Sequence, residues 1–146
     1  MKKIKEYRNE AQLQQDMVIW FKNNYLSLRR RLWATMNEGK NVTEKLGLGM
    51  TPGVPDLLYY GENERLYGFE VKLPGTKHGV KHLLTQAQWM LDVLPGRAWF
   101  VDSLETFQKA IEGNINEADL IDPQRVKDYC ESCIKNSLVW DRSLFV

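Results

Sequence analysis

The chain has 146 residues, of which 43% are hydrophobic and 11% aromatic, enough for one domain of ordinary size with a buried core. No apolar run approaches the roughly 18 residues that a membrane span needs, and the charged N-terminal segment lacks the apolar stretch of a signal peptide, so we expect a cytoplasmic protein without a membrane partner. The net charge of +1 is unevenly spread: residues 1–50 carry ten Lys and Arg against five Asp and Glu, and the remainder carries ten against fourteen. This asymmetry fits a basic face opposite an acidic centre, although it also occurs in proteins that bind no nucleic acid.

The first third of the chain predicts a helix, a short strand and a long loop. Residues 8 to about 28 place apolar side chains at helical spacing, which is typical of an amphipathic helix packed on a core. Arg29, Arg30 and Arg31 follow, either as contacts for a backbone phosphate or, the interpretation we favour, as basic partners of the helix end. Residues 31–36 predict a strand, and the glycine-rich residues 37–53 predict a long loop, which in a compact domain is usually functional or disordered.

The middle of the chain begins with a hairpin. Residues 55–60 and 65–72 are rich in aliphatic and aromatic side chains, and a Gly-Glu-Asn-Glu turn separates them. Residues 73–82 combine Gly and Pro with basic and histidine side chains, and they predict a second polar loop.

A helix, a strand and another helix follow this loop. Thr85 has the character of a helix N-cap, and Gln88 three residues later would complete a capping box. Residues 97–102 predict a strand, and Ser103 predicts the cap of the next helix. The order helix, strand, strand, strand, helix, strand, helix predicts an α/β fold in which helices flank a mixed sheet.

Residues 114–146 predict an extension of the domain formed by residues 1–113. A helix from about Pro123 to Asn136 and an apolar tail are expected to pack on the same domain or on a partner subunit.

The two cysteines, Cys130 and Cys133, are too few for a disulfide scaffold. They form a CxxC pair, and His78 and His82 would complete the four ligands of a structural zinc site. We favour instead two partly buried cysteines three positions apart on a helix.

The hairpin carries charges that a hydrophobic core would not favour. If its turn centres near Asn63, Asp56 lies opposite Glu70, and opposed side chains share a face with Cβ atoms about 4.5–5.5 Å apart. Lys72 follows Glu70 by two residues, so it points to the same face about 6–7 Å along the strand. Local geometry therefore predicts two carboxylates and a lysine on one patch.

Two carboxylates at this separation repel each other unless a cation joins them or one stays protonated. Mg²⁺ (or Mn²⁺) suits the patch because it prefers oxygen ligands, needs only one or two carboxylates and keeps several waters. The backbone carbonyl of Val71 is a candidate further ligand, and Lys72 would orient or help to deprotonate an attacking water. The competing interpretation is a surface hairpin with an ordinary Asp–Lys or Glu–Lys pair.

Four motifs in order carry a resemblance to a known family. The chain resembles the VRR-NUC family of the PD-(D/E)XK nuclease superfamily over about residues 8–111. The matching pieces are Glu10 and Gln14, Gly53-Val54-Pro55-Asp56-Leu57, Glu70-Val71-Lys72, and Thr85-Gln86-Ala87-Gln88.

The resemblance implies a restriction-endonuclease-like core and a metal-dependent DNA endonuclease, structure-selective for junctions or flaps. It implies Asp56 and Glu70 as metal ligands, Lys72 as the catalytic lysine, and Glu10 as a further acidic group reaching the metal. It implies Gln88 in the catalytic set and Gln14 as a supporting residue that we expect to contact nucleic acid. A homodimer is implied too, and no small-molecule cofactor is expected.

Several of these assignments have a plain alternative. Glu10 and Gln14 could form a solvated helix face, and Gln88 could serve only as a cap. Asn37, which ends a strand aimed toward the site, is a candidate substrate contact that turn chemistry also explains. A basic cluster expected to contact phosphates could equally be a solvated loop; it consists of Lys77, His78, Lys81 and His82.

Two other functions stay open beside the DNA endonuclease. One is a catalytically silent nucleic-acid-binding or assembly module that keeps the fold. The other is a nuclease directed to RNA, since only the resemblance favours DNA.

Overall fold

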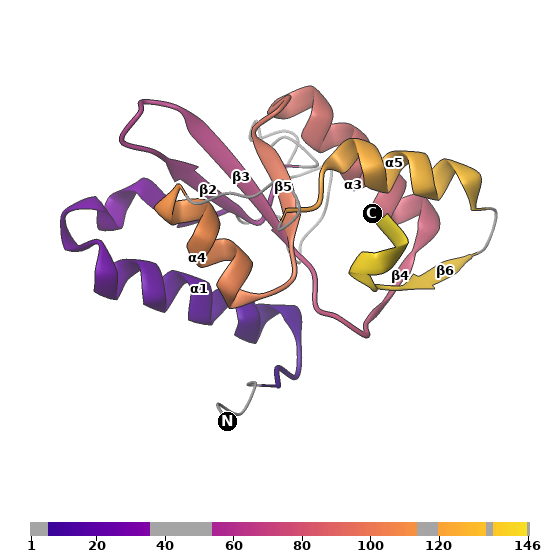
Figure 1. Ribbon diagram of the computed structural model, residues 1–146, viewed down its shortest axis with the longest axis horizontal. Coiled ribbons are helices and arrows are strands. Elements are labelled where there is room, and N and C mark those ends of the chain that lie inside the picture. Colours follow the sequence, from indigo (N-terminus) through magenta and orange to yellow (C-terminus); the bar gives the residue numbers. More distant parts are fainter. Residues whose placement is uncertain (1–5, 36–53, 114–119, 134–135, 146) are drawn as a thin grey trace, which may run out of the picture.

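The computed structural model describes residues 6–35, 54–113, 120–133 and 136–145 (Figure 1). The loop expected over 37–53, with Asn37 and Gly53, lies outside the described residues. The helices are α1 (Glu10–Asn24), α3 (Val80–Val93), α4 (Leu104–Glu112) and α5 (Pro123–Ser132), with 3₁₀ turns η1 (Leu26–Arg31) and η3 (Arg142–Phe145). The strands are β1 (Leu32–Ala34), β2 (Leu57–Tyr60), β3 (Leu66–Val71), β4 (Lys77–Gly79), β5 (Ala98–Val101) and β6 (Ser137–Val139).

A mixed sheet organises the chain. Its strand order is β1-β2-β3-β5, in which β1–β2 and β2–β3 are antiparallel and β3–β5 is parallel. Helices α1 and α4 lie together beside the sheet, and α3 and α5 pair on the other side of β5 (Figure 1). The expected α/β fold with helices flanking a mixed sheet is thereby confirmed.

Strand β5 separates two hydrophobic clusters because its side chains alternate between the two faces of the sheet. Val101 packs with the buried stripe of α1 and with Phe107 of α4. Ala98 and Phe100 pack with α3, α5 and the C-terminal residues.

The first helix is shorter than expected. It begins at Glu10, one residue after its N-cap Asn9, whose side chain accepts a hydrogen bond from the Gln12 amide. It ends at Asn24, and η1 then carries the three arginines. Arg29 Nε donates to the carbonyl of Lys22 at 2.9 Å, which confirms the helix-end interpretation for this residue.

The expected N-cap at Thr85 is wrong. Helix α3 begins at Val80, and Thr85 lies inside it, where its hydroxyl donates to the Lys81 carbonyl at 2.9 Å. A mid-helix threonine commonly bonds to the carbonyl four residues earlier, so it can be mistaken for a cap. The loop expected over 73–82 is likewise wrong in its second half, because β4 pairs with β6.

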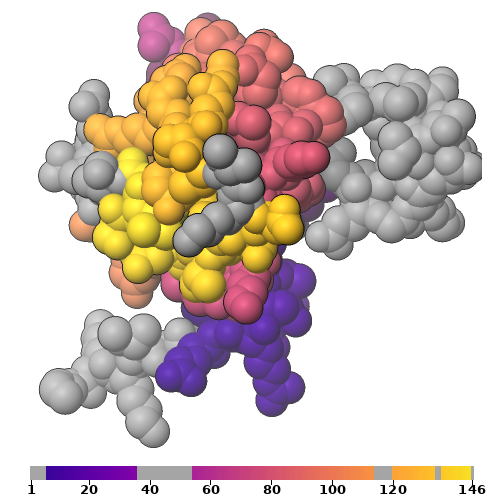
Figure 2. All heavy atoms as spheres, turned by 90° about the vertical axis from the view of Figure 1, so that its right-hand side faces the viewer, coloured from indigo at the N-terminus to yellow at the C-terminus, as the bar shows by residue number. Residues whose placement is uncertain are grey.

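The C-terminal segment packs on the chain's own core. Helix α5 lies against α3, and β6 pairs with β4; Figure 2 shows these orange and yellow segments directly beside the pink ones. Trp140 is 1% exposed and its indole N–H donates to Asp102. Arg142 forms an ion pair with the same carboxylate, so the tail is anchored to the end of β5. None of the described helices is long and apolar enough to cross a membrane.

The two cysteines sit at the end of α5. Cys130 is buried and Cys133 is partly buried. Among the described residues no group of three or more His, Cys, Asp or Glu is arranged to hold a metal, so the zinc alternative gains no support. Burial first, and then the neighbouring Cys133, raise the pKa of the Cys130 thiol to about 11.

This pKa predicts unequal thiol reactivity. Only the thiolate attacks a disulfide reagent, and Cys130 is almost fully protonated at about pH 8 as well as inaccessible. We expect Ellman's reagent to label Cys133 in the native protein and Cys130 only after denaturation. A Cys133→Ser variant should then show no rapid labelling in the native state. Rapid labelling that persists in this variant would contradict the burial of Cys130.

Candidate active site

The hairpin register brings the two predicted carboxylates together. Leu57 pairs with Phe69 and Leu58 with Gly68, which is the register expected from the sequence. Asp56 is the next residue outward and therefore adjoins Glu70. A side-chain hydrogen bond between these two carboxyl groups is among the effects that raise the pKa of Glu70.

Close packing at the start of β2 positions Asp56. Thr35 donates its hydroxyl to the Pro55 carbonyl at 2.6 Å and its amide to the Asp56 carbonyl at 2.9 Å. Pro55 lies so close over Gly68 that a Cβ there would be 2.6 Å from the proline ring, so only glycine fits. The carboxylate of Asp56 then accepts a hydrogen bond from the Val71 amide at 2.8 Å.

Glu70 and Lys72 are both withdrawn from solvent, with 6% and 3% of their surface exposed. Lys72 Nζ lies 3.7 Å from Glu70 Oε1, and Gln86 Nε2 donates to the same oxygen at 3.1 Å. Burial above all, and then the charge of Asp56, hold the pKa of Glu70 well above its usual range, while Lys72 acts in the opposite direction. A buried carboxylate of this kind is unfavourable unless it is neutralised.

Glu10 joins this group from the first turn of α1. Its Oε1 accepts a hydrogen bond from the Leu73 amide at 3.4 Å and lies 3.3 Å from Nε2 of His78 on β4. Its charge also raises the pKa of Glu70, although this is the smallest of the effects that act on that carboxyl group. We call Glu10, Asp56 and Glu70 the acidic cluster, with Lys72 as its buried lysine.

His78 lies beside the acidic cluster as a largely neutral imidazole, and His82 is an exposed residue in the first turn of α3. Burial, and then the charges of Lys72 and His82, lower the pKa of His78 to about 4. The pKa of His82 is lowered by burial and by Lys72. Lys72 is thus a common neighbour of both histidines.

The remaining predicted contacts lie on or near these elements. Lys77 and Lys81 are exposed, in β4 and the first turn of α3. Gln14 is half-buried one turn after Glu10 on α1. Val71 contributes its amide to Asp56, and its carbonyl as a metal ligand stays a prediction.

Gln86, to which the sequence pattern assigned no role, contacts Glu70, and a catalytic role for Gln88 stays a prediction. The side-chain amide of Gln88 donates to Asp92 at 3.0 Å, whereas Gln86 reaches Glu70. The helical pattern held a signal for this, because Gln86 lies three residues after Leu83 and four before Met90, at the edge of the buried stripe. The motif resemblance favoured Gln88, and its alternative role in a capping box is wrong because α3 begins at Val80.

The donor set of the acidic cluster suits a hard divalent cation. Three carboxyl groups gather near one buried lysine; Glu70 is withdrawn from solvent, whereas the Glu10 side chain is 34% exposed. Gln86 Oε1 is also buried and has no hydrogen-bond donor among the described residues. Carboxylate and amide oxygens are the ligands that Mg²⁺ and Mn²⁺ prefer. Their separations do not form a finished metal-binding group within the described ranges.

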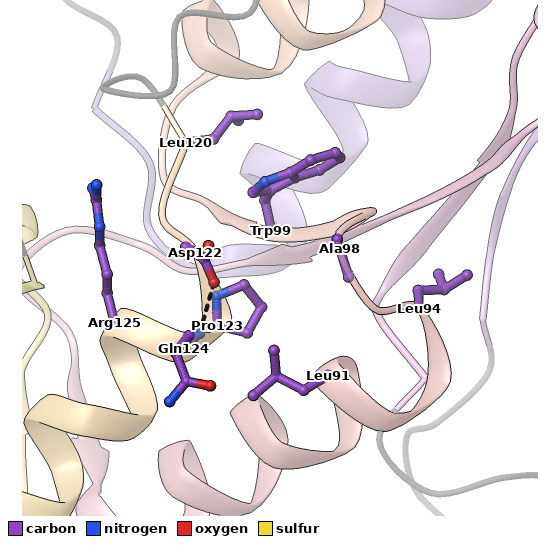
Figure 3. A pocket seen from close by; sticks show the side chains of 10 residues that line it. Leu91, Leu94, Ala98, Trp99, Leu120, Asp122, Pro123, Gln124 and Arg125 are labelled. Atoms are coloured by element: carbon purple, nitrogen blue, oxygen red, sulfur yellow. Dashed lines mark hydrogen bonds between the residues drawn. The ribbon is translucent and has the colours of Figure 1, made fainter.

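A separate cavity of about 550 Å³ lies between the end of α3, β5 and the start of α5 (Figure 3). Leu91, Leu94 and Trp99 contribute apolar walls. The carboxylate of Asp122 caps α5 by accepting a hydrogen bond from the Gln124 amide at 2.7 Å. No member of the acidic cluster lines this cavity, and it offers no comparable set of reactive groups.

Comparison with known proteins returns no family to which the chain can be assigned. No protein-family description matches it, and no curated protein or solved structure is significantly similar to it. The function proposed below is therefore supported by the chemistry of the acidic cluster and by the motif resemblance.

Proposed function

We propose that this chain is a Mg²⁺- or Mn²⁺-dependent nuclease that hydrolyses phosphodiester bonds in DNA. The observation that carries the proposal is the convergence of Asp56, Glu70 and Lys72 at one end of the hairpin, with Glu70 and Lys72 buried. A surface ion pair would have been exposed and would require no second carboxylate. The mixed sheet flanked by helices is compatible with a restriction-endonuclease-like core, and the motif resemblance favours the VRR-NUC type.

Each residue of the cluster has a role in this proposal. Asp56 and Glu70, with Glu10 beside them, would hold the cation, which would supply Lewis-acid activation of water and neutralise phosphate charge. Lys72 would orient the attacking water or accept its proton, and offset negative charge that develops at the phosphoryl oxygens. Gln86 would keep the Glu70 carboxylate in place through its 3.1 Å hydrogen bond.

Selectivity for branched DNA and a homodimeric assembly belong to the same proposal and derive from the motif resemblance. The acidic cluster would bind a cation that contacts a phosphate group, and both DNA and RNA carry such groups. RNA is therefore included as a substrate in the test.

The decisive variant is Asp56→Asn. Asparagine keeps a side-chain oxygen for the Val71 amide, so the hairpin should stay folded while the ligand charge is lost. We expect wild-type protein with Mg²⁺ or Mn²⁺ to cut at least one of a four-way junction, a flap, a duplex, a single strand or an RNA. Asp56→Asn should lower that rate at least about a hundredfold, since loss of a residue that merely supports a metal ligand already costs 10- to 100-fold.

The matched control is Glu62→Gln, which removes an exposed carboxylate from the turn of the same hairpin. It should cut like wild type, and EDTA should stop both. A second readout needs no activity: Mg²⁺ or Ca²⁺ should raise the melting temperature of wild type but not of Asp56→Asn, because a ligand stabilises the state that binds it. Nucleic-acid binding without cleavage of any substrate would favour the silent binding module, and undiminished cutting by Asp56→Asn would refute the proposed site.

A further inference from the structure

A basic groove runs beside β1, the edge strand of the sheet that the described residues form. Its volume is about 640 Å³, and its walls come from the second half of α1, from η1 and from β1 itself. The lining residues combine positive charge with apolar surface: Ile19, Lys22, Asn23, Arg29, Arg30, Leu32 and Trp33.

The charge of this groove is one-sided. Among the described residues that line it, Lys22, Arg29 and Arg30 are charged and none is a carboxylate. Within the described ranges none of these three side chains takes part in an ion pair. The hydrogen bond from Arg29 Nε to the Lys22 carbonyl holds that guanidinium at the groove while leaving its other N–H groups available. Such a surface complements a polyanion.

Trp33 adds an aromatic surface to the positive charge. Its side chain is 42% exposed, although an indole of this size is usually well covered. Trp33 on β1 lies opposite Leu58 on β2. Asp56 precedes Leu58 by two residues along the extended chain. Opposed residues share a face and alternate residues return to it, so Trp33 belongs to the sheet face of Asp56 and Glu70. Trp33 therefore stands on the Asp56 side of the edge strand, whereas the α1 wall of the groove packs on the opposite face with Leu32.

We propose that this groove binds a single-stranded segment of nucleic acid, with Lys22, Arg29 and Arg30 on its phosphates and Trp33 stacked on a base. An exposed indole can stack only on a base that has left its own helical stack, so the combination favours a single strand over a duplex. A second copy of the chain is a poorer occupant, because a two-fold interface would set the same positive patch against itself. The assignment of this strand as part of the cleavage substrate rests on the proposed function.

The test measures binding without cleavage. Fluorescence anisotropy of a labelled oligothymidylate in EDTA would be compared with that of a labelled duplex. Trp33→Leu keeps an apolar side chain but removes the stacking surface, and it should weaken single-strand binding about tenfold, whereas Trp33→Phe should retain most of it. The Arg29→Gln/Arg30→Gln double variant should reduce the slope of log affinity against log salt by about 1.4, from roughly 0.7 for each phosphate contact.

Matched controls come from other faces of the chain. Trp89→Ala removes a tryptophan that is 38% exposed on α3, and Arg65→Gln removes an exposed arginine from the hairpin turn. Both should bind the single strand like wild type. Unchanged binding by the groove variants, or an equal loss in the controls, would overturn the proposal.

Two further measurements separate this inference from the proposed nuclease. Asp56→Asn should bind the single strand at least as well as wild type, because it removes negative charge without touching the groove. If no substrate is cut but the Trp33 and arginine variants still lose single-strand binding, the groove stands and the nuclease fails. If cutting is metal-dependent but sedimentation shows that Trp33→Leu only dissociates a dimer, with single-strand binding intact, the nuclease stands and the groove is an interface between copies instead.

Discussion

Replacing Lys72 by methionine is expected to lower the free energy of unfolding of the metal-free protein by about 3–5 kcal/mol, the usual loss when one partner of a buried ion pair is removed. Lys72 is 3% exposed, and its ammonium lies 3.7 Å from a carboxylate that is itself buried. Methionine has a similar volume, so a cavity would explain little of the effect. Urea denaturation in EDTA would measure it.

A double variant tests whether charge is the cause. Glu70→Gln/Lys72→Met removes both charges, keeps an oxygen for Gln86 and should recover most of the lost stability. Lys127→Met is the control, since Lys127 pairs with Glu131 at 3.9 Å on the exposed face of α5. Such a surface pair contributes about 0–1 kcal/mol. If Lys72→Met destabilised the chain no more than Lys127→Met does, the buried electrostatic coupling described here would be wrong.

Trp140→Ala is expected to destabilise the protein by about 3–5 kcal/mol, the range for a fully buried tryptophan cut back to alanine. The ring of Trp140 packs on Phe145 at 4.6 Å and on Phe100 at 5.5 Å between centroids. Its backbone bonds to Gly75 and Thr76 at 3.0 and 2.8 Å, so the residue also ties the tail to the segment before β4. Thermal or chemical denaturation would report the loss.

Position-matched variants sharpen this second prediction. Trp140→Phe should lose less, because an aromatic ring still fills most of the site, although the hydrogen bond to Asp102 disappears. Leu144→Ala changes a tail residue that is 39% exposed and should lie within about 1 kcal/mol of wild type. A loss below about 1 kcal/mol for Trp140→Ala would mean that the tail contributes little to the fold. His78 lies against the Trp140 ring with centroids 6.2 Å apart, so the proposed nuclease activity should fall together with stability.

Local patterns in the sequence sufficed for the features that depend on near neighbours. The hairpin is one such feature, because a short turn determines its register and the register alone sets Asp56 beside Glu70. The Ser103 cap of α4 is another, since its hydroxyl accepts the Thr106 amide at 3.2 Å. The element order likewise indicated the mixed sheet flanked by helices.

Features that depend on distant partners were decided by the tertiary structure. Lys77, His78 and Gly79 have no strong strand preference, and they form β4 because Ser137–Val139 arrives from about sixty positions later to pair with them. The same pairing brings His78 to Glu10, and the start of α3 at Val80 directs Gln86 to Glu70.

The sequence by itself determined that two carboxylates and a lysine share one face, because strand geometry has a fixed period of two residues. Burial turned this charged patch into a candidate site. Only the packed chain withdraws Glu70 and Lys72 from water, and only it gathers Glu10, Gln86 and His78 from separate elements around them. The energy of a charge depends on the solvent and neighbours that surround it, which a linear pattern does not contain.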